Sequence, residues 1–327
     1  MIDFVIPWVD GNDHEWQAEK AKYSTNKNSE AGDYRYRDMG LLPYWFRGVE
    51  KFAPWVNKIH FITCGHLPKW MNTSHPKLNI VKHADYIPQE YLPTFNSNTI
   101  ILNFHRISNL SENFVFFNDD MFLIDKVKTS DFFVNNIPCD QALMRNMTPD
   151  GSHFSKILFN NMSVINKHFK KHEVIKKNFF KWFNPKYGLN SCYINWQNYR
   201  QTRFSDMVNP HLAIAHKKSE FEYVWSVESE LLHQTCVHKF RDSEDVTDWL
   251  VRYFRIMKGE FIPYPIIGNF FNLNIHNFAE ASDTIKKQKC KQICINDTEY
   301  NIDFESTQKE VLNAFEIILP EKCSYEV

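Results

Sequence analysis

The stretch Asn113–Leu123, NFVFFNDDMFL, organises the rest of the chain. Its FVFF run is apolar and rich in β-formers, which is the pattern of a strand buried on both faces. The run stops in Asn118-Asp119-Asp120 before apolar residues resume. Two adjacent carboxylates at the end of a buried strand are costly unless a positive group lies beside them. We therefore expect either a divalent cation that holds a diphosphate here, or a polar turn in which Asp119 caps a helix.

A second acidic turn follows the N-terminal stretch MIDFVIPWV, which is the pattern of another buried strand. This turn, DGND, contains Asp10, Asn12 and Asp13. If the two strands are parallel neighbours, both acidic turns lie at the same edge of the sheet. The alternative is that Asp10 and Asp13 only form the turn and cap the next helix.

Strand and helix patterns alternate along the first part of the chain. Strands are predicted at 58–63 and 78–82, and helices at 15–27 and from Arg35 to about Phe52. This rhythm predicts an α/β fold with a Rossmann-like parallel-core sheet, helices on both faces and a mainly helical C-terminal part. The expected parts are a Rossmann-like half at 1–135, an insertion region at 136–210 and a helical part at 211–327. In the last part, Ser243 is predicted to cap a helix whose first turn contains Glu244 and Asp245.

Composition excludes several classes of protein. The 327 residues include 38 basic and 39 acidic side chains, and this balance argues against a nucleic-acid partner. There is no glycine-rich phosphate loop, and the seven cysteines are scattered in a chain without a signal peptide. We expect a reduced, cytoplasmic protein without a zinc site, because Cys290 and Cys294 lack a second Cys/His pair. No apolar run approaches the ~18 residues that a membrane span requires.

The segment 168–183, HFKKHEVIKKNFFKWF, is both basic and aromatic. As one helix it would place most of its aromatic side chains on one side, which is the pattern of an interfacial helix on anionic lipid. The segment is thus a candidate for peripheral contact with the inner face of the plasma membrane. The alternative is that the aromatic residues pack in the core and the lysines form a solvated face.

Four blocks of the chain stand in a fixed order: IDFVIPWVDGND (Ile2–Asp13), RYRDMG through FVFFNDDMFL (Arg35–Leu123), HLAIAHKKSEFEYVW with HKFRDSEDV (His211–Val246), and CINDTE (Cys294–Glu299). Together they cover well over half of the chain. In this order they resemble the Stealth family of bacterial capsule and cell-wall polysaccharide phosphotransferases, which are related to the eukaryotic GlcNAc-1-phosphotransferase of lysosomal enzymes. The resemblance implies a GT-A-like sheet that binds a nucleotide-sugar in 1–135, an acceptor side in 136–210 and an active site completed by 211–327. One departure is LAIAH after His211, where the family has a run that contains proline.

The resemblance implies the transfer of a hexose 1-phosphate, such as GlcNAc-1-P, GalNAc-1-P or Gal-1-P, from a UDP-sugar to a sugar hydroxyl, with release of UMP. The acceptor would be an oligosaccharide, expected to be lipid-linked. Phosphoryl transfer needs in-line positioning, neutralised phosphate charge and a base for the attacking hydroxyl. A nucleotide-sugar glycosyltransferase would use the same kind of acidic site but release UDP. A carbohydrate-binding module would use the aromatic residues and need no acidic turns.

The predicted site combines the acidic turns with the residues that the resemblance adds. Mg²⁺ or Mn²⁺ would be held by Asp119, Asp120 and Asp297. The catalytic residues are expected to be Arg241, which would hold the phosphate, and His211 or Asp13 as the base. The residues expected to bind substrate are Asp10, Asn12, Arg35, Arg37, His105, Arg106 and Asn118. For Arg241 the alternative is a pair with Glu244 or Asp245, and for His105 and Arg106 an ordinary helix face; His238 is expected to be structural.

Overall fold

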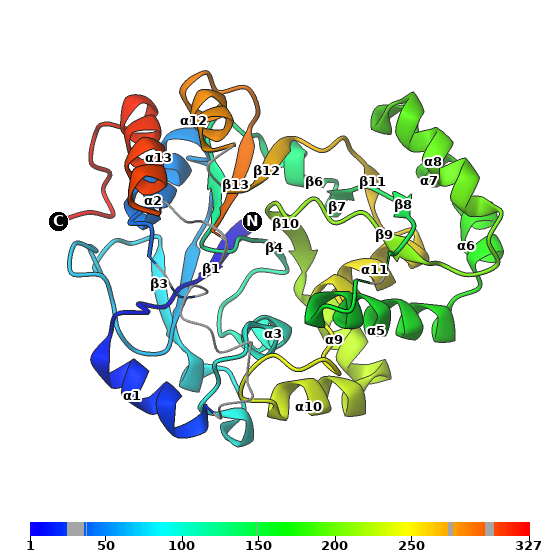
Figure 1. Cartoon of the computed structure of the whole chain (residues 1–327), viewed down its shortest axis with the longest axis horizontal. Helices are drawn as coiled ribbons and strands as arrows, with labels where there is room; N and C mark the ends of the chain where they lie inside the picture. The colour runs from blue at the N-terminus through cyan, green and yellow to red at the C-terminus, as the bar shows by residue number, and fades with distance from the viewer. Residues whose placement is uncertain (25–35, 37, 149, 274–276, 298–303) are drawn as a thin grey trace.

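The computed structural model describes residues 1–24, 36, 38–148, 150–273, 277–297 and 304–327. At its centre is a five-stranded sheet in the order β10-β4-β1-β2-β3 (Figure 1). Its strands are β1 (Ile2–Pro7), β2 (Ile59–Thr63), β3 (Leu78–Lys82), β4 (Asn113–Phe116) and β10 (Ile214–Lys217). The first four are parallel, and β10 adds antiparallel to β4 at one edge. The predicted α/β fold with a parallel core is confirmed.

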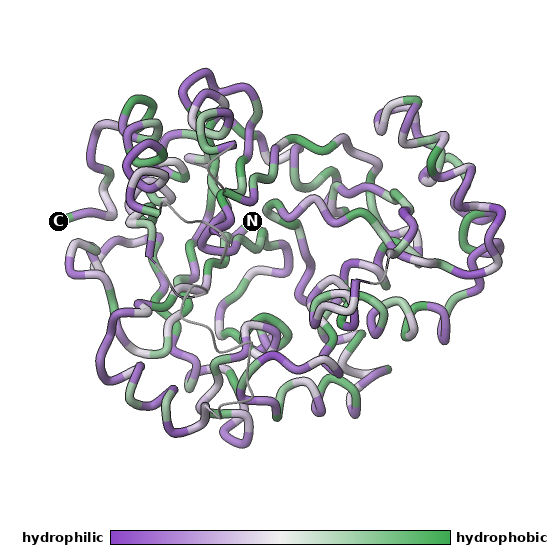
Figure 2. The backbone as a smooth tube through the Cα atoms, viewed as in Figure 1, coloured by the Kyte–Doolittle hydropathy of each residue, from purple (hydrophilic) through white to green (hydrophobic). Residues whose placement is uncertain are grey.

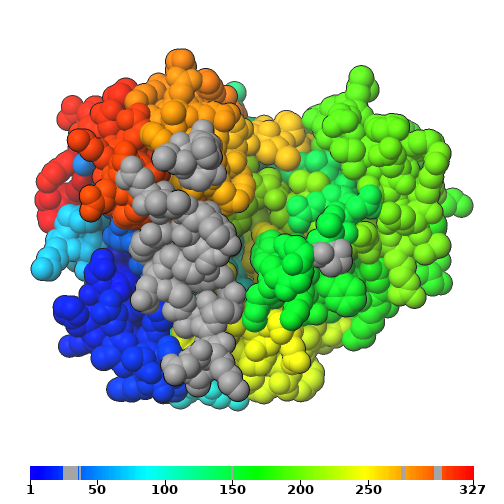
Figure 3. Space-filling view, viewed as in Figure 1, coloured from blue at the N-terminus to red at the C-terminus, as the bar shows by residue number. Residues whose placement is uncertain are grey.

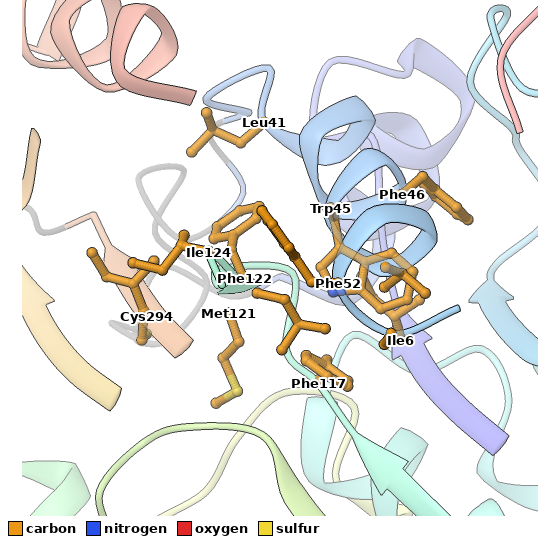
Figure 4. Close-up of a cluster of buried hydrophobic side chains, with 14 of the residues drawn as sticks. Ile6, Leu41, Trp45, Phe46, Phe52, Phe117, Met121, Phe122, Ile124 and Cys294 are labelled. Carbon is orange, nitrogen blue, oxygen red and sulfur yellow. The ribbon is translucent and has the colours of Figure 1, made fainter. Parts of the chain in front are cut away.

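Helices cover both faces of this sheet. Successive residues of a strand point to opposite faces, so Phe4 and Ile6 enter one apolar cluster while Val5 enters the other. The first cluster packs against α2 (Leu42–Phe52), α12 (Phe278–Lys286) and α13 (Phe304–Ile318). The second packs against α3 (Ser97–Leu102), α5 (His153–His168), α9 (Lys218–Val227), α10 (Ser229–Val237) and α11 (Trp249–Lys258). Figure 4 shows the first cluster, in which Phe117 lies near Trp45 of α2.

Helix α2 shows how local sequence sets an element's start. Trp45, Phe46, Val49 and Phe52 are buried at helical spacing, as predicted. The helix begins at Leu42 and not at Arg35, because Gly40 adopts a left-handed φ of 71° and a proline occupies the first turn. Arg35 itself lies outside the described residues.

The C-terminal part is mainly helical, as predicted, and it also contributes strands. A second sheet, in the order β12-β13-β5, joins it to the N-terminal half. Its strands are β12 (Gly268–Asn272), β13 (Gln292–Asn296) and β5 (Met121–Leu123). The smaller strands are β6 (Phe133–Val134), β7 (Ile137–Asp140), β8 (Met144–Arg145), β9 (Asp206–Met207) and β11 (Ile262–Pro263). The second apolar cluster contains residues of all three predicted parts, so these parts share a core.

The segment 168–183 is not one amphipathic helix. Helix α5 ends at His168, and α6 (Lys171–Lys177) and α7 (Phe179–Trp182) follow as short separate turns. Lys171 and Trp182 are buried, so the segment does not form a single basic and aromatic face. Within the described parts of the chain, no helix combines the length and apolarity that a bilayer crossing needs.

Candidate active site

The two acidic turns leave the sheet at the same edge. Strands β1 and β4 pair in parallel with Val5 opposite Phe116, and the Phe117 N–H donates to the Val5 carbonyl at 2.9 Å. The turns that follow β1 and β4 therefore meet beyond the carboxyl ends of the strands, where ligands bind in open α/β sheets. The predicted juxtaposition of the two turns is confirmed. Asn118 closes its own turn, where its carbonyl accepts the Met121 N–H at 3.2 Å.

Asp119 and Asp120 carry more negative charge than their surroundings balance. The Asp120 Oδ1 atom is buried and has no hydrogen-bond partner among the described residues. Crowding by protein atoms and the Asp120 charge raise the pKa of Asp119 to about 7, although its side chain stays accessible to solvent. Such a pair is stabilised by a cation, which supports the fit of a divalent metal to these residues.

Strand β13 brings a third part of the chain to the same place. It runs antiparallel to β5, and its Ile295 N–H donates to the Asp120 carbonyl at 2.8 Å. Asp297 follows β13 directly, at the end of the strand that neighbours Asp120. The structure thus brings the three predicted metal ligands, Asp119, Asp120 and Asp297, to one edge.

Cys294 of β13 is a neighbour that the sequence did not indicate. Its Sγ, a carboxylate oxygen of Asp120 and a ring nitrogen of His211 all lie within 4.8 Å of one another. Burial and the Asp120 charge raise the pKa of Cys294 well above its ordinary value. A thiol is a soft ligand that suits zinc, whereas the carboxylate oxygens of Asp119, Asp120 and Asp297 suit Mg²⁺ or Mn²⁺. Spacing rules missed Cys294 because its partners come from distant segments.

His211 lies against the acid pair from the opposite side of β4. It precedes β10, has a left-handed φ of 48°, and packs edge-on against Phe270 at 5.1 Å between ring centroids. Its Nε2 is 3.5 Å from Asp120 Oδ2. Burial opposes a charged ring, but the Asp120 carboxylate outweighs it and raises the pKa of His211. Asp248, a buried acid not predicted from the sequence, adds negative charge near this ring; burial raises its own pKa to about 6.

The turn 238–245 is fastened to the start of α3 by one buried carboxylate. Asp245 accepts hydrogen bonds from Asn96 Nδ2 at 2.8 Å, His238 Nδ1 at 2.7 Å and the Asp242 N–H at 3.0 Å. The prediction that Ser243 caps a helix was wrong, because α11 begins only at Trp249. Asp245 accepts hydrogen bonds within this turn and does not lie in the first turn of a helix.

Arg241 projects from that turn toward the acid cluster. Its Nε and Nη2 atoms donate to Ser97 Oγ at 3.0 and 2.6 Å. Its charge also lowers the pKa of Asp119, against the larger effects of crowding by protein atoms and of the Asp120 charge, so Arg241 acts electrostatically on the acid pair. A planar guanidinium in this position can hold a phosphate through two hydrogen bonds.

The turn after β1 uses its polar side chains locally. Asp13 Oδ1 accepts the Trp16 N–H at 2.7 Å and caps α1 (His14–Tyr23). Asp10 Oδ1 accepts the N–H of Asn12, whose own side chain is exposed. These contacts match the alternative interpretation of turn and cap. Among the described residues, no hydrogen bond or ion pair links Asp13 to the acid pair or His211, which weakens the case for Asp13 as the base.

His66 is a further residue of this turn that the sequence did not indicate. It holds the turn by accepting the Asp10 N–H at 2.7 Å.

His105 and Arg106 require a correction, because they lie away from the acid cluster. The His105 ring stacks on Phe221 at 6.5 Å, and the Arg106 guanidinium lies over Trp225 at 5.2 Å. Both aromatic residues belong to α9, which starts where Lys217 pairs with Asn113, at the opposite end of β4 from Asp119. Burial and the neighbouring Arg106 charge lower the pKa of His105 to about 4. The predicted Arg35 and Arg37 lie outside the described residues.

Two protein-family models match the N-terminal half of this chain. Residues 2–28 match the Stealth protein conserved region 1, and residues 35–140 match conserved region 2. The capsular polysaccharide phosphotransferase WcwK of Streptococcus pneumoniae is 41% identical over 100% of this chain and 98% of its own. The receptor polysaccharide phosphotransferase WefC of Streptococcus oralis is 38% identical over 100% and 99%. The exopolysaccharide phosphotransferase cps2G of Lactiplantibacillus plantarum is 36% identical over 99% and 96%.

Among solved structures, the galactosyltransferase LgtC, in complex with donor and acceptor sugar analogues, aligns over 95% of both chains. Its TM-score of 0.39 at 8% identity is too low to support any conclusion about function. The sequence relatives are decisive, because they match at 36–41% identity along almost their whole length. This chain belongs to the Stealth protein family.

Proposed function

We propose that this protein transfers a hexose 1-phosphate from a UDP-sugar to a sugar hydroxyl of a growing capsular or exocellular polysaccharide, and releases UMP. Relatives along the full chain are named polysaccharide phosphotransferases, which supports phosphotransfer as the class of reaction. The observation that carries the proposal is the acid pair at the strand ends, in which Asp120 Oδ1 has no partner in the described structure and the Arg241 charge acts on Asp119. Such a site suits a ligand that contains both a cation and phosphate groups.

The metal would be Mg²⁺ or Mn²⁺, held by Asp119, Asp120 and Asp297. Carboxylate oxygens are the ligands that these hard cations prefer. A bound cation would neutralise negative charge on the diphosphate of the donor.

The proposed reaction breaks the bond between the two phosphates of the donor. The acceptor hydroxyl oxygen attacks the phosphorus that bears the hexose, the bridging P–O bond breaks, and UMP leaves. Arg241 holds the transferred phosphate, and the anomeric carbon keeps its oxygen throughout. His211 accepts the hydroxyl proton, because the other candidate base, Asp13, already caps α1.

The product nucleotide tests the reaction directly. Purified protein would be incubated with UDP-GlcNAc, UDP-GalNAc or UDP-galactose and an oligosaccharide acceptor, and UMP and UDP would be measured separately. We expect UMP, loss of activity in EDTA, and recovery on addition of Mg²⁺ or Mn²⁺. Release of UDP would instead identify a glycosyltransferase.

His211→Ala tests the assignment of the base. A general base contributes typically ~10²–10⁴ in rate, so kcat should fall by that factor while KM for the donor changes little. The matched control is His172→Ala, which removes an exposed histidine of α6. Turnover close to normal in His211→Ala would assign the base elsewhere, with Asp13 the next residue to substitute.

A further inference from the structure

The charges of this nearly neutral chain are unevenly distributed. Residues 151–205 contain ten Lys or Arg and one acidic residue, Glu173, whereas the rest of the chain contains 28 basic and 38 acidic residues. This segment includes α5, α6, α7 and α8 (Leu189–Tyr199), and α6–α8 form the right-hand end of the molecule (Figures 1 and 3). One end of the molecule is therefore strongly basic.

Helix α8 exposes an apolar stripe at this basic end. Leu189, Tyr193 and Trp196 follow one another at i, i+4 and i+7, and so lie along one face of the helix. Their side chains are 88%, 54% and 48% exposed. The opposite face is anchored, because Asn195 is fully buried and donates to the carbonyls of Ala142 and Trp182. The stripe is thus held outward by the packing of the other face.

Helix α7 exposes two more aromatic side chains next to α8. Phe179 and Phe180 are 50% and 81% exposed, while Trp182 of the same helix is completely buried. The helices are joined through Asn184, which donates to the Phe180 carbonyl at 3.0 Å and accepts from Cys192 Sγ of α8 at 3.3 Å. In Figure 2, hydrophilic and hydrophobic residues alternate along these outer helices.

Some basic side chains of the segment stabilise the fold, and others are exposed. Lys171 is buried and donates to the carbonyls of Asn198 and Arg203. Lys181 similarly donates to the carbonyls of Gly259 and Phe261. In contrast, Lys176 and Lys177 are exposed, and the exposed Arg200 lies with its guanidinium over the Trp196 ring at 4.3 Å.

We propose that the α7–α8 face, formed by Phe179, Phe180, Leu189, Tyr193 and Trp196 with the surrounding Lys and Arg, docks on an anionic lipid bilayer. Phe and Leu side chains have no polar group with which to bind a sugar, but they partition favourably into the acyl boundary. The basic side chains complement the charge of anionic headgroups. This face replaces the single helix 168–183 of the sequence hypothesis. Docking would bring the enzyme to a lipid-linked acceptor, but the inference does not depend on the reaction proposed above.

Vesicle flotation with the full chain tests this surface. At low salt, we expect wild-type protein to float with vesicles of phosphatidylglycerol and phosphatidylcholine, and far less with phosphatidylcholine alone. The partition coefficient should fall at least about tenfold in Lys176→Glu/Lys177→Glu and in Leu189→Ser/Trp196→Ser. The controls are Lys69→Glu/Lys126→Glu, which changes two exposed lysines elsewhere, and Ile317→Ser, which changes an exposed apolar residue of α13. Thermal melts of each variant would establish that it is folded.

Three results would overturn the proposal. The wild-type protein fails to float, the controls lose binding as much as the test variants, or the test variants float normally. If they float normally but lose turnover on a water-soluble acceptor fragment, the face binds the anionic glycan instead. Because flotation needs neither donor nor acceptor, failure of the proposed reaction would leave its outcome unaffected.

Discussion

Two clusters of charged side chains in this protein handle charge in opposite ways. In the ion cluster, Asp140 accepts hydrogen bonds from Arg252 at 2.7 and 3.0 Å and from Arg255, and Arg255 also bonds Glu220 at 2.9 Å. Two acids there face two guanidinium groups. In the strand-end cluster, Asp119 and Asp120 lie together, and one Asp120 oxygen has no partner in the described parts of the chain.

The pKa values of the two clusters follow this difference. Burial alone would raise the pKa of Asp140, but the charges of Arg252 and Arg255 lower it to about 2. Asp119 has no comparable compensation, so crowding by protein atoms and the Asp120 charge raise its pKa to about 7. A cluster that only stabilises the fold balances its charges within the protein, whereas a cluster left with an excess of one sign is suited to a ligand.

The ion cluster also supports the site. Arg252 Nη1 donates to the Val208 carbonyl at 3.0 Å and to Asn209 Oδ1 at 2.7 Å. These residues come just before His211, so the balanced cluster holds the backbone that presents the proposed base.

The largest expected effect comes from removing the shared carboxylate of the ion cluster. Asp140→Asn leaves two buried guanidinium groups without their shared carboxylate, and should lower the free energy of unfolding by about 3–5 kcal/mol. Denaturant titration measures this. The control, Asp283→Asn, removes an acid paired with Lys287 and Lys289 at the surface and should change stability little. A loss of less than about 1 kcal/mol in Asp140→Asn would show that this cluster is not a determinant of stability.

Replacing an aspartate by asparagine in the strand-end cluster should lower activity without destabilising the fold. Asp120→Asn or Asp119→Asn should lower the rate of UMP release roughly a thousandfold, because a cation contributes several kcal/mol of charge stabilisation. The thermal midpoint should stay the same or rise, because one of two repelling charges is removed. Full activity of either variant in EDTA, or a loss of stability like that of Asp140→Asn, would remove the distinction between the clusters.

Arg241→Lys tests whether the strand-end site needs the shape of the guanidinium group, because the substitution keeps the positive charge and removes the planar group. A lysine cannot form the planar fork that holds a phosphate through two hydrogen bonds, so kcat should fall about a hundredfold. Ser97→Ala, which removes the hydroxyl that Arg241 contacts, should cost less than about tenfold, since it leaves the guanidinium in place. Wild-type kinetics in Arg241→Lys would mean that only the charge of Arg241 matters.

The smallest expected effect is the loss of the Asp140 contribution to stability at acid pH. Because the pKa of Asp140 lies near 2 in the folded protein and at 3.8 ordinarily, its contribution to stability is complete above the ordinary value and is lost as pH falls through the lower one. The stability difference between wild type and Asp140→Asn should therefore shrink by about 2 kcal/mol between about pH 5 and about pH 2. A constant difference across this range would contradict the lowered pKa.

The sequence by itself determined the parallel core and the acidic turns. The strands β1 to β4 are short apolar runs, and a short apolar run indicates a strand that is buried in the core. A parallel sheet then places the turns after β1 and β4 at one edge, whatever the rest of the chain does. His211, Arg241 and Asp297 entered through the family resemblance, since nothing in their local pattern separates them from ordinary polar residues.

Only the tertiary structure decided which side chains meet at that edge. Cys294 reaches Asp120 because β13 pairs with β5, and Arg241 contacts Ser97 of α3 because Asp245 fastens its turn to the start of that helix. His105 and Arg106 precede β4 in sequence but pack on α9, far from its acidic end. Periodicity records which face of an element is buried, and it carries no information about the distant segment that covers that face. The site and the exposed α7–α8 face both depend on such long-range packing. For this reason the sequence located the edge of the sheet but not all of the side chains that surround it.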